Sequence, residues 1–450
     1  MDFLEFRKAA ARVVPSEKQM KWYETGMYAF IHFGVNTFTG SEWGTGKEDP
    51  KIFNPEKLDC GQWVDAVKSA GLKGMVLTAK HHDGFCLWPS GYTEHTIKNS
   101  PYKNGKGDVV REAAEACRKG GIKFGVYLSP WDRNSKLYGT PKYNDFYCNQ
   151  LTELCTRYGE LFYLWFDGAC GEGPNGKKQE YDFRRYKEII RKYQPNACIF
   201  HSENSYSSDI RWVGNEAGKS PYEQWSVVPA LPEGEAGTQT GPGPLACERP
   251  LNNTIFEKRG SLDTVIYSKG LVFWPAEADV SIRRGWFYHP EEEPHPLERL
   301  LQIYLNSYGN NAGLNLNIPP DKNGLFDQKD ALRLKEFGEM IKEKFSQNKA
   351  AGLKTKKIRE NENGQAEYEL AFGKNTEFDY IVLKEDISKG QRVEAFRVGA
   401  HSTNGNGEYV YEGATIGYRK IIPLCTVSDK INIKIIAARD CVNLLDVEVY

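Results

Sequence analysis

The 450-residue sequence contains no run of 18 consecutive apolar residues and almost no net charge, with 59 lysines and arginines against 60 aspartates and glutamates. The first absence excludes a transmembrane helix, which needs about 20 apolar residues in a row. The second argues against nucleic acid or an anionic membrane as the partner, because both attract proteins with a basic excess. The composition, 40% hydrophobic and 26% charged, is that of a globular protein.

Cysteine pairs of the metal-binding or redox type are also missing. The ten cysteines are scattered without any C-x-x-C spacing, which indicates mostly free, buried thiols and a reducing compartment. Residues 1–24 carry charges throughout and lack the apolar core of a signal peptide. We therefore expect a cytoplasmic protein. The alternative, an exported protein whose leader has been trimmed, has the same sequence.

Three common catalytic motifs are absent as well. No G-x-S-x-G elbow, Walker A sequence or glycine-rich phosphate fingerprint occurs, which disfavours serine-hydrolase and nucleotide-dependent chemistry. Aromatic residues are abundant instead, at 13%, with 10 tryptophans and 25 tyrosines. Such side chains can build a large core, and they can also stack on the apolar face of a sugar ring.

Short apolar runs rich in β-branched and aromatic residues recur along most of the chain. They are 27–33, 74–84, 122–132, 161–168, 197–204, 209–216, 271–277 and 314–320. Runs without polar alternation suit strands that are buried on both faces. Eight such strands predict an α/β fold of the (β/α)8 barrel type, with a doubly wound sheet as the alternative.

Helices are expected between several of these runs. Asp59 and Asp108 can each cap one, with glycines as stop signals at Gly71 and after residue 119. Further helical patterns cover 144–158, 183–193, 296–307 and 327–346. The Gly/Pro-rich stretch 232–244 is expected to be a long loop, either a lid over the site or a passive surface loop.

The pattern changes after the last of these helices. Residues 347–360 are polar and basic, as in a linker, and strand-like pieces separated by Gly, Asn and Asp turns follow. This predicts a C-terminal antiparallel β-sandwich. We therefore expect two domains, a catalytic (β/α)8 barrel over residues 1–348 and a β-sandwich domain over residues 355–450.

Polar residues follow the apolar runs, where a barrel places its active site. They are His32, His81, His82, Asp83, Tyr127, Asp167, His201, Glu203 and Glu216. Asp167 ends the apolar run 161–166 and is followed by glycine. A rigid strand end holds a nucleophile at the short distance that attack requires. The alternative role for Asp167 is to cap the segment that follows it.

Cleavage of a glycoside needs a second carboxyl group, which donates a proton to the leaving oxygen. Glu216, in RWVGNEAG, follows an apolar run and has small neighbours that leave room for a substrate. Glu203, in HSEN, is its rival, and Glu277 is a third choice. The residue chemistry alone does not separate them.

The segment AKHHDGF also permits a metal site, because two imidazoles and a carboxylate cluster there. Adjacent residues on an extended strand point to opposite sides, so His81 and His82 could share an ion only if the strand breaks at that point. No H-x-H or HExxH motif accompanies them. Neutral imidazoles that hydrogen-bond sugar hydroxyl groups are the favoured interpretation.

Four segments occur in order: GMYAFIHFGVNTFTGSEW, LTAKHHDGFCLW, GVYLSPWD and LFYLWFDGACGEG. Together they resemble the α-L-fucosidases of glycoside hydrolase family 29, over residues 20–350. The resemblance implies a retaining mechanism without a metal or other cofactor, acting on a fucosylated oligosaccharide or glycoconjugate. It implies Asp167 as the nucleophile. WVGNEAG resembles the branch that prefers α-1,3/1,4-fucosyl linkages on Lewis-type glycans, with Glu216 as its acid/base, and FWPAEADVSIRRGWF also resembles that branch.

The same resemblance implies which side chains bind fucose. They are His32, Glu42, Trp43, His81, His82, Tyr127 and Trp286. Because fucose carries a methyl group, one wall of its pocket should be apolar, and Phe33, Trp225 and Trp286 are candidates, although core packing suits Phe33 better. Two other classes stay open, a metal-dependent barrel hydrolase or isomerase and a non-catalytic fucoside-binding relative. The sequence predicts no oligomeric state.

Overall fold

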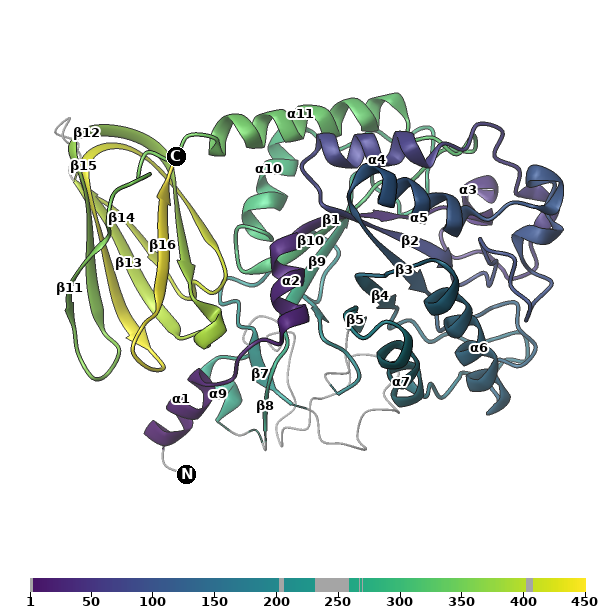
Figure 1. The fold of residues 1–450 in the computed structure, drawn as a ribbon, viewed down its shortest axis with the longest axis horizontal. Helices are drawn as coiled ribbons and strands as arrows, with labels where there is room; N and C mark the ends of the chain where they lie inside the picture. The colour runs from purple at the N-terminus through teal and green to yellow at the C-terminus, as the bar shows by residue number, and fades with distance from the viewer. Residues whose placement is uncertain (1–2, 202–205, 231–258, 267, 269, 402–407) are drawn as a thin grey trace.

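The computed structural model describes residues 3–201, 206–230, 259–266, 268, 270–401 and 408–450. Glu203 and the loop expected over 232–244 lie outside these ranges. The N-terminal part of the chain is a barrel of parallel strands, and helix α11 (Gln328–Phe345) leads from it towards an antiparallel β domain (Figure 1). Within the described residues, no helix has both the length and the apolar character that crossing a membrane requires.

Eight parallel strands form the barrel, and their order in the sheet is β5-β4-β3-β2-β1-β10-β9-β6. They are β1 (Met27–Ile31), β2 (Gly74–Lys80), β3 (Lys123–Leu128), β4 (Tyr163–Phe166), β5 (Cys198–His201), β6 (Arg211–Trp212), β9 (Ala276–Ser281) and β10 (Ala312–Asn317). A parallel bridge between Phe200 and Ile210 joins β5 to the start of β6 and closes the ring. The predicted barrel is therefore confirmed.

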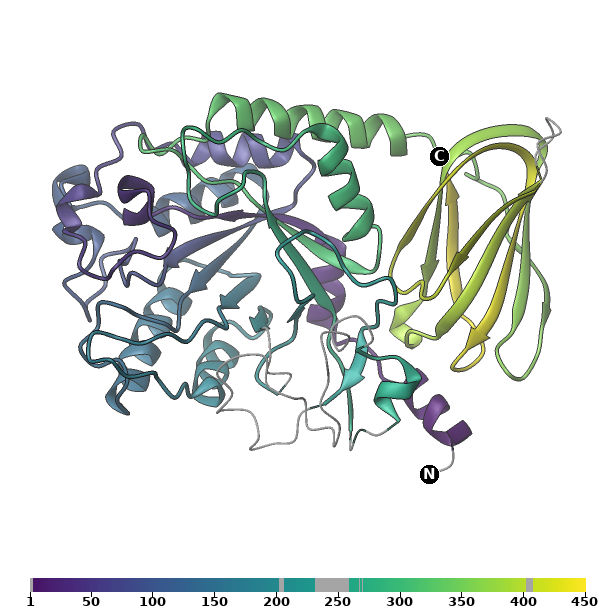
Figure 2. The ribbon, with the colours of Figure 1, turned by 180° about the vertical axis from the view of Figure 1, so that it is seen from behind.

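Helices cover the outside of the barrel and its amino-terminal end (Figure 2). The outer ones are α4 (Cys60–Ser69), α5 (Val109–Gly120), α6 (Lys142–Arg157), α7 (Phe183–Tyr193), α10 (Leu297–Asn306) and α11. Helix α2 (Glu17–Thr25) closes the amino-terminal end, where a Cβ on Gly313 would lie 2.4 Å from the Trp22 ring. Only glycine fits at the start of β10, because the indole packs directly on the backbone there.

Shorter helices lie outside the barrel wall. They are α1 (Phe3–Ala11), α3 (Val35–Thr39), α9 (Leu262–Val265) and the 3-10 turns η1 (Pro50–Ile52), η2 (Ile97–Asn99), η3 (Tyr102–Gly105) and η4 (Ile387–Lys389). The capping residues expected from the sequence start α4 and α5. Asp108 accepts a hydrogen bond from the Arg111 N–H, and Gly121 ends α5 in a left-handed conformation with φ of 71°.

Replacing Asp59 with alanine is expected to lower the free energy of unfolding by about 1 kcal/mol. Its Oδ1 atom accepts the backbone N–H groups of Gly61 at 2.8 Å and Gln62 at 3.2 Å, and alanine leaves both without that acceptor. Urea denaturation measures the loss. Asp65→Ala, an exposed position on the same helix, is the matched control and should change stability by less than about 0.5 kcal/mol. Equal losses in both variants would contradict the capping role.

The seventh barrel strand does not lie where the sequence placed it. Leu271–Phe273 forms β8, which pairs antiparallel with β7 (Val227–Pro229) outside the barrel. The barrel strand β9 begins only at Ala276, after Pro275. Glu277 and Asp279 interrupt its apolar character, and both side chains are buried. The prediction of a strand over 271–277 was therefore displaced, because a barrel strand with two interior acids has no unbroken apolar run.

The C-terminal domain is a six-stranded antiparallel sheet that folds on itself. Its strands are β11 (Lys356–Glu360), β12 (Ala366–Glu385), β13 (Val393–His401), β14 (Glu408–Gly413), β15 (Lys420–Ala438) and β16 (Leu444–Val449). The register of β12 against β15 is interrupted between Ala371 and Thr376. Side chains from both sides of this bend, such as Leu370 and Phe378, share one apolar cluster. The two halves of the sheet thus face each other across a core, as in a sandwich.

One part of the predicted linker is a strand. Lys356–Glu360 pairs with β12 at the edge of the sheet, and all five of its residues are exposed. Charged side chains are usual on edge strands because they discourage pairing with other chains. They also gave this segment the polar composition of a linker.

Hydrogen bonds join the β domain to the barrel. Gln391 accepts the Ser226 N–H at 2.8 Å and donates to the Gln224 carbonyl at 2.9 Å. Asn311, next to the start of β10, accepts the Tyr418 N–H at 2.8 Å. The β domain is therefore joined to the barrel by hydrogen bonds between side chains of one unit and the backbone of the other.

Candidate active site

Six side chains predicted from the sequence meet at the carboxyl ends of the barrel strands. They are His32 after β1, His81 and His82 after β2, Tyr127 on β3, Asp167 after β4 and Trp286 after β9. Neighbouring rings in this group have centroids 4.2 to 6.2 Å apart. The barrel thus gathers them around one opening.

Asp167 is held by hydrogen bonds on both of its oxygen atoms. Oδ1 accepts the Ala169 N–H at 2.8 Å, and Oδ2 accepts the Tyr127 hydroxyl at 3.0 Å. The His82 Nε2 atom lies 3.8 Å from the same Oδ2, and the Asp167 side chain is 26% exposed. The local turn that the sequence allowed as an alternative role is present, and it also orients the second oxygen towards the opening.

Glu216 lies on the loop after β6, within the same opening. The Trp286 indole donates from Nε1 to Glu216 Oε2 at 3.2 Å. The residue is accessible to solvent, but partial burial of its carboxyl group raises the pKa, and the charges of Asp167 and Glu42 raise it further. The Trp286 hydrogen bond acts in the opposite direction. A raised pKa favours the protonated form that a proton donor needs near neutral pH.

Glu277, the third choice for the acid/base, lies deep inside the barrel. It is 0% exposed and accepts hydrogen bonds from the Tyr163 hydroxyl at 2.6 Å, Trp165 Nε1 at 2.7 Å and Asn315 Nδ2 at 3.1 Å, with Tyr28 as a fourth donor. These donors surround the carboxyl group and leave no room for a leaving oxygen. Its position supports a structural role, which ties β9 to three other strands.

His32 depends on a residue that the sequence did not single out, Asn317 at the end of β10. The Asn317 amide nitrogen donates to Ser281 Oγ at 2.9 Å and to the Trp286 carbonyl at 2.8 Å. Its oxygen therefore faces the His32 Nδ1 atom, 2.8 Å away, and accepts a hydrogen bond from the Nδ1–H group. Burial lowers the pKa of His32 to about 3. The imidazole is neutral, and its Nε2 atom is an acceptor suited to a hydroxyl group.

His82 is positioned by Ser129, which sequence reasoning also missed. Nδ1 of His82 lies 2.7 Å from Ser129 Oγ, and this hydroxyl donates to the Trp131 carbonyl at 2.7 Å. The Trp131 ring lies 4.9 Å from His82, and Trp43 stands edge-on to Trp131 at 5.7 Å. Because Trp43 is 58% exposed, it extends this aromatic wall towards solvent. Ser129 stands directly after an apolar run, which is the signal that could have identified it.

The two adjacent histidines lie on the same side of the chain. Strand β2 ends at Lys80, and the rings of His81 and His82 are 4.2 Å apart. Both histidines follow the strand, so the extended backbone that would point their side chains to opposite sides has already ended at Lys80. In the described part of the chain, no three His, Cys, Asp or Glu side chains are grouped as metal ligands. Burial lowers the pKa of both imidazoles, which suits neutral hydrogen-bonding groups.

Glu42 contacts the loop after β9. Its Oε2 atom accepts the Trp286 N–H at 3.0 Å, and its Oε1 atom lies 3.0 Å from His289 Nε2. The Phe287 N–H reaches the same carboxylate at 3.4 Å. Glu42 therefore holds the segment that carries Trp286.

Of the three candidates for an apolar wall, only Trp286 lines the opening. Phe33 is buried in the core, with its ring 5.8 Å from that of Trp63. Trp225 is fully buried between the barrel and the β domain, where the Arg439 guanidinium lies 3.5 Å from its ring centroid. The hypothesis that Trp225 lines the pocket was wrong, because this tryptophan fills the contact between the two units.

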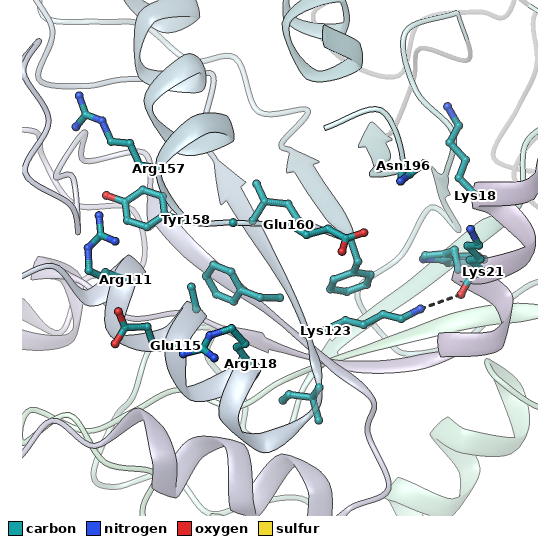
Figure 3. A pocket seen from close by; sticks show the side chains of 17 residues that line it. Lys18, Lys21, Arg111, Glu115, Arg118, Lys123, Arg157, Tyr158, Glu160 and Asn196 are labelled. Carbon is teal, nitrogen blue, oxygen red and sulfur yellow. Dashed lines mark hydrogen bonds between the residues drawn. The ribbon is translucent and has the colours of Figure 1, made fainter. Parts of the chain in front are cut away.

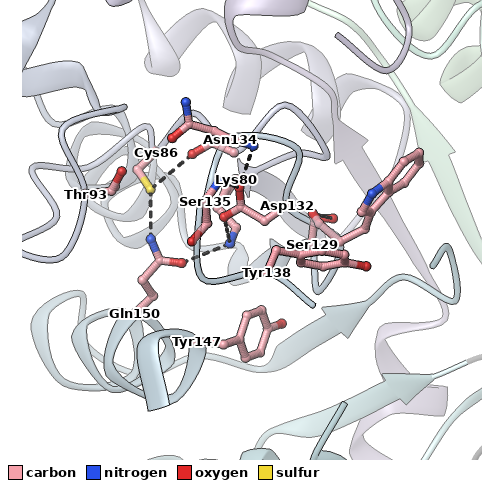
Figure 4. Close-up of polar contacts among 12 residues, drawn as sticks. Lys80, Cys86, Thr93, Ser129, Asp132, Asn134, Ser135, Tyr138, Tyr147 and Gln150 are labelled. Atoms are coloured by element: carbon pink, nitrogen blue, oxygen red, sulfur yellow. Dashed lines mark hydrogen bonds and ion pairs between the residues drawn. The ribbon is translucent and has the colours of Figure 1, made fainter. Parts of the chain in front are cut away.

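A buried ion pair joins Lys80, at the end of β2, to Asp132 in the loop after β3 (Figure 4). Lys80 Nζ lies 3.0 Å from Asp132 Oδ2 and donates to Gln150 Oε1 at 2.9 Å, with the lysine 0% exposed. The backbone N–H of Arg133 donates to the His82 carbonyl at 2.8 Å. A buried charge needs such complete pairing. The pair therefore holds the loops after β2 and β3 in register.

The free energy of unfolding is expected to fall on acidification because of His201, at the end of β5. Burial lowers its pKa from 6.5 to about 4. Below pH 6.5 the unfolded chain binds a proton that the native protein excludes, so the native state loses stability as the pH falls towards 4. Between pH 7 and pH 5 this contribution is about 2 kcal/mol.

Urea denaturation of the wild type and His201→Gln at pH 5, 7 and 8 measures this difference. Between pH 7 and pH 5 the free energy of unfolding should fall by about 2 kcal/mol less in the variant than in the wild type. Between pH 7 and pH 8 the two curves should run almost parallel, because the imidazole is mostly neutral in both states there. Parallel curves over the whole range would contradict the prediction.

A groove at the opposite end of the barrel has a volume of about 730 Å³ and a rim rich in cations (Figure 3). Most of these cations are paired with carboxylates of neighbouring residues. The pairs are Lys18 with Asp209, Lys21 with Glu17, Arg111 with Asp108 and Arg157 with Glu153. The groove therefore has little unbalanced charge, and none of the strand-end residues lines it.

Comparison with known proteins gives one consistent result. The family model described as alpha-L-fucosidase matches residues 10–344. The chain is 39% identical to α-L-fucosidase 1 of Arabidopsis thaliana, over 94% of this chain and 84% of that protein.

Solved structures agree with these matches. A glycoside hydrolase 29 family member from an unknown rumen bacterium is 38% identical, with a TM-score of 0.85, over 97% of this chain and 77% of that one. A Ruminococcus gnavus GH29 fucosidase in complex with fucose is 30% identical, with a TM-score of 0.83, over 98% and 95% of the two chains.

Proposed function

The chain belongs to the α-L-fucosidases of glycoside hydrolase family 29, and we propose that it releases α-1,3/1,4-linked fucose from branched, Lewis-type glycans. It is a glycoside hydrolase, and a purely carbohydrate-binding role is thereby set aside. The proposal adds the linkage, the roles of the two carboxyl groups and the residues that hold the sugar.

The proposed fucose site is the group of side chains at the strand ends. The Ruminococcus gnavus relative binds fucose, and the neutral histidines and Tyr127 offer hydrogen-bonding groups of the kind that sugar hydroxyls need. His32 would accept from a hydroxyl group through Nε2, because its Nδ1 proton is used by Asn317. Trp286, 5.1 Å from His32, would contact the apolar side of the ring.

The proposed reaction has two displacements. In the first, a carboxylate oxygen of Asp167 forms a bond to the anomeric carbon while the bond to the leaving oxygen breaks. Glu216 gives its proton to that oxygen, and the freed alcohol departs. In the second, Glu216 removes a proton from water, whose oxygen replaces Asp167 at the anomeric carbon. Fucose leaves with its original configuration, and both carboxyl groups return to their starting states. Such chemistry requires the two groups about 5–5.5 Å apart.

One contact carries the proposed linkage preference. WVGNEAG and FWPAEADVSIRRGWF are the two segments that resemble the α-1,3/1,4 branch, and they lie on different barrel strands. Glu216 of the first accepts a hydrogen bond from Trp286 of the second at 3.2 Å. The features that resemble this branch thus meet at the point where the leaving sugar would be protonated.

Fucose release from three substrates tests the proposal. The substrates are a Lewis-type trisaccharide, an α-1,2-fucosylated trisaccharide and an aryl α-L-fucoside, and released fucose is quantified for each. We expect efficient cleavage of the Lewis-type trisaccharide and little cleavage of the α-1,2-linked one. Equal rates on the two trisaccharides, or a preference for the α-1,2 linkage, would overturn the proposed specificity. The aryl α-L-fucoside measures fucosidase activity independently of the linkage between two sugars.

A further inference from the structure

We propose that the segment from Ser281 to His289 positions the acid/base, with the Trp286 indole N–H as the group that holds Glu216. This inference rests on the proposed role of Glu216. It assigns to Trp286 a task different from contact with the sugar. Trp286 acts through another side chain and is therefore a positioning residue for proton transfer.

The first observation is the contact itself. Within the described residues, Trp286 Nε1 is the one hydrogen-bond donor to the Glu216 carboxyl group, at 3.2 Å. Glu216 lies on a solvent-accessible loop after a strand of only two residues, Arg211–Trp212. The backbone on either side is held, since the Val213 N–H donates to the Glu277 carbonyl at 2.9 Å and the Gly218 N–H to the Asp279 carbonyl at 3.2 Å, but these bonds do not set the rotamer of the Glu216 side chain. A carboxyl group that must both give and take a proton needs a defined orientation, and the indole supplies one.

The second observation is that the backbone of Trp286 is fixed on both sides. Its N–H donates to Glu42 Oε2 at 3.0 Å, and its carbonyl accepts from Asn317 Nδ2 at 2.8 Å. One residue before Trp286, the Gly285 carbonyl accepts a hydrogen bond from Ser281 Oγ at 2.7 Å. These bonds come from three separate barrel loops or strands. The indole is therefore placed by rigid partners rather than by its own loop alone.

The third observation is a buried anchor under the same segment. Arg283 Nε donates to both oxygens of Asp330 on α11, at 3.0 and 2.8 Å. Its Nη1 atom donates to the carbonyls of His289 at 3.2 Å and Glu292. Arg283 and Asp330 are 2% and 0% exposed. This buried charge pair ties the end of the segment to α11, although it contacts neither the proposed sugar site nor Glu216.

Trp286→Phe tests the proposal, because it keeps the ring and removes the N–H donor. kcat/KM is measured on aryl α-L-fucosides whose leaving groups range from activated (2-chloro-4-nitrophenol) to poor (phenol). Activated leaving groups need little help from an acid, whereas poor ones depend on it. Any loss of contact with the fucose ring affects both substrates equally, so we expect kcat/KM to fall roughly tenfold or more further for the phenyl fucoside than for the activated one.

The pH profile gives a second readout. A hydrogen bond from the indole favours the ionised form of Glu216, so its removal should raise the pKa of this group. The alkaline limb of kcat/KM, where the acid loses its proton, should move to higher pH in Trp286→Phe. A purely structural defect would lower the whole profile without moving the limb. Circular dichroism and thermal unfolding of the variant confirm that it is folded.

Trp131→Phe is the matched control. It removes an indole N–H at the same opening, but that group donates to the Glu172 carbonyl at 3.1 Å instead of to an acid. Trp131→Phe should change kcat/KM by the same factor for substrates with good and with poor leaving groups. Glu216→Ala separates this inference from the proposed function. If Glu216→Ala shows leaving-group dependence and Trp286→Phe does not, the positioning role of Trp286 is wrong. If Glu216→Ala shows none, the acid/base assignment itself fails.

Discussion

Asp167→Ala is expected to lower kcat/KM on an aryl α-L-fucoside by about four orders of magnitude or more, the scale seen when a hydrolase loses its nucleophile. The substitution removes the oxygen that would bond to the anomeric carbon. It also removes the acceptors of the Tyr127 hydroxyl and the Ala169 N–H. Asp167 is partly exposed rather than part of the core, so the fold should persist, which circular dichroism and thermal unfolding can measure.

Rescue by azide tests whether the loss of activity in Asp167→Ala comes from the missing nucleophile. A small anion can enter the space of the missing carboxylate and attack the anomeric carbon directly, which should yield the β-configured fucosyl azide. Glu172→Ala, an exposed position in the loop that follows, is the control and should retain activity. A folded Asp167→Ala protein with activity close to the wild type would remove Asp167 as the nucleophile.

Glu216→Ala should lose about 100-fold to 10,000-fold in kcat/KM on substrates with poor leaving groups and far less on activated aryl fucosides, because only the former need a proton from the enzyme. Lewis-type trisaccharides belong to the poor class, since their leaving group is a sugar alcohol. The second displacement should slow for every substrate, because no base activates water. Parallel kcat/KM measurements on both substrate classes reveal the difference.

Azide should rescue Glu216→Ala by a different route. It needs no base, so it can attack the fucosyl-enzyme and give the azide with the α configuration of the substrate. The two variants are thus distinguished by the configuration of one product. Glu203→Ala is the comparison, and the α-azide pattern in that variant instead of Glu216→Ala would move the acid/base to Glu203.

The sequence predicts well those parts of the molecule that depend on interactions between residues close together along the chain. Apolar runs marked most barrel strands, because parallel strands covered on both faces need no polar alternation. Capping aspartates marked α4 and α5 for a similar reason, since a cap bonds to the next few backbone groups. Asp167 stood out because a carboxylate that ends an apolar strand has few structural reasons to be there.

The residues that sequence reasoning missed depend on partners far along the chain. Strand β9 was misplaced because Glu277 is stabilised inside the barrel by donors from β1, β4 and β10, none of which lies nearby in sequence. Asn317 was missed for the same reason, since its partner His32 is 285 residues away. Such residues look like surface polar groups until the barrel closes.

Beside β6, which has two residues, the described part of the barrel has one parallel bridge to β5, between Phe200 and Ile210, and this junction is the seam of the barrel. The proposed nucleophile directly follows β4, which pairs with β3 and β5, whereas the proposed proton donor lies next to this seam. The two proposed catalytic groups are therefore carried by differently supported parts of the barrel, and the Trp286 hydrogen bond to Glu216 connects them. If the proposed roles hold, exchanges of loop sequence beside the seam should alter the choice of glycan more than the binding of fucose.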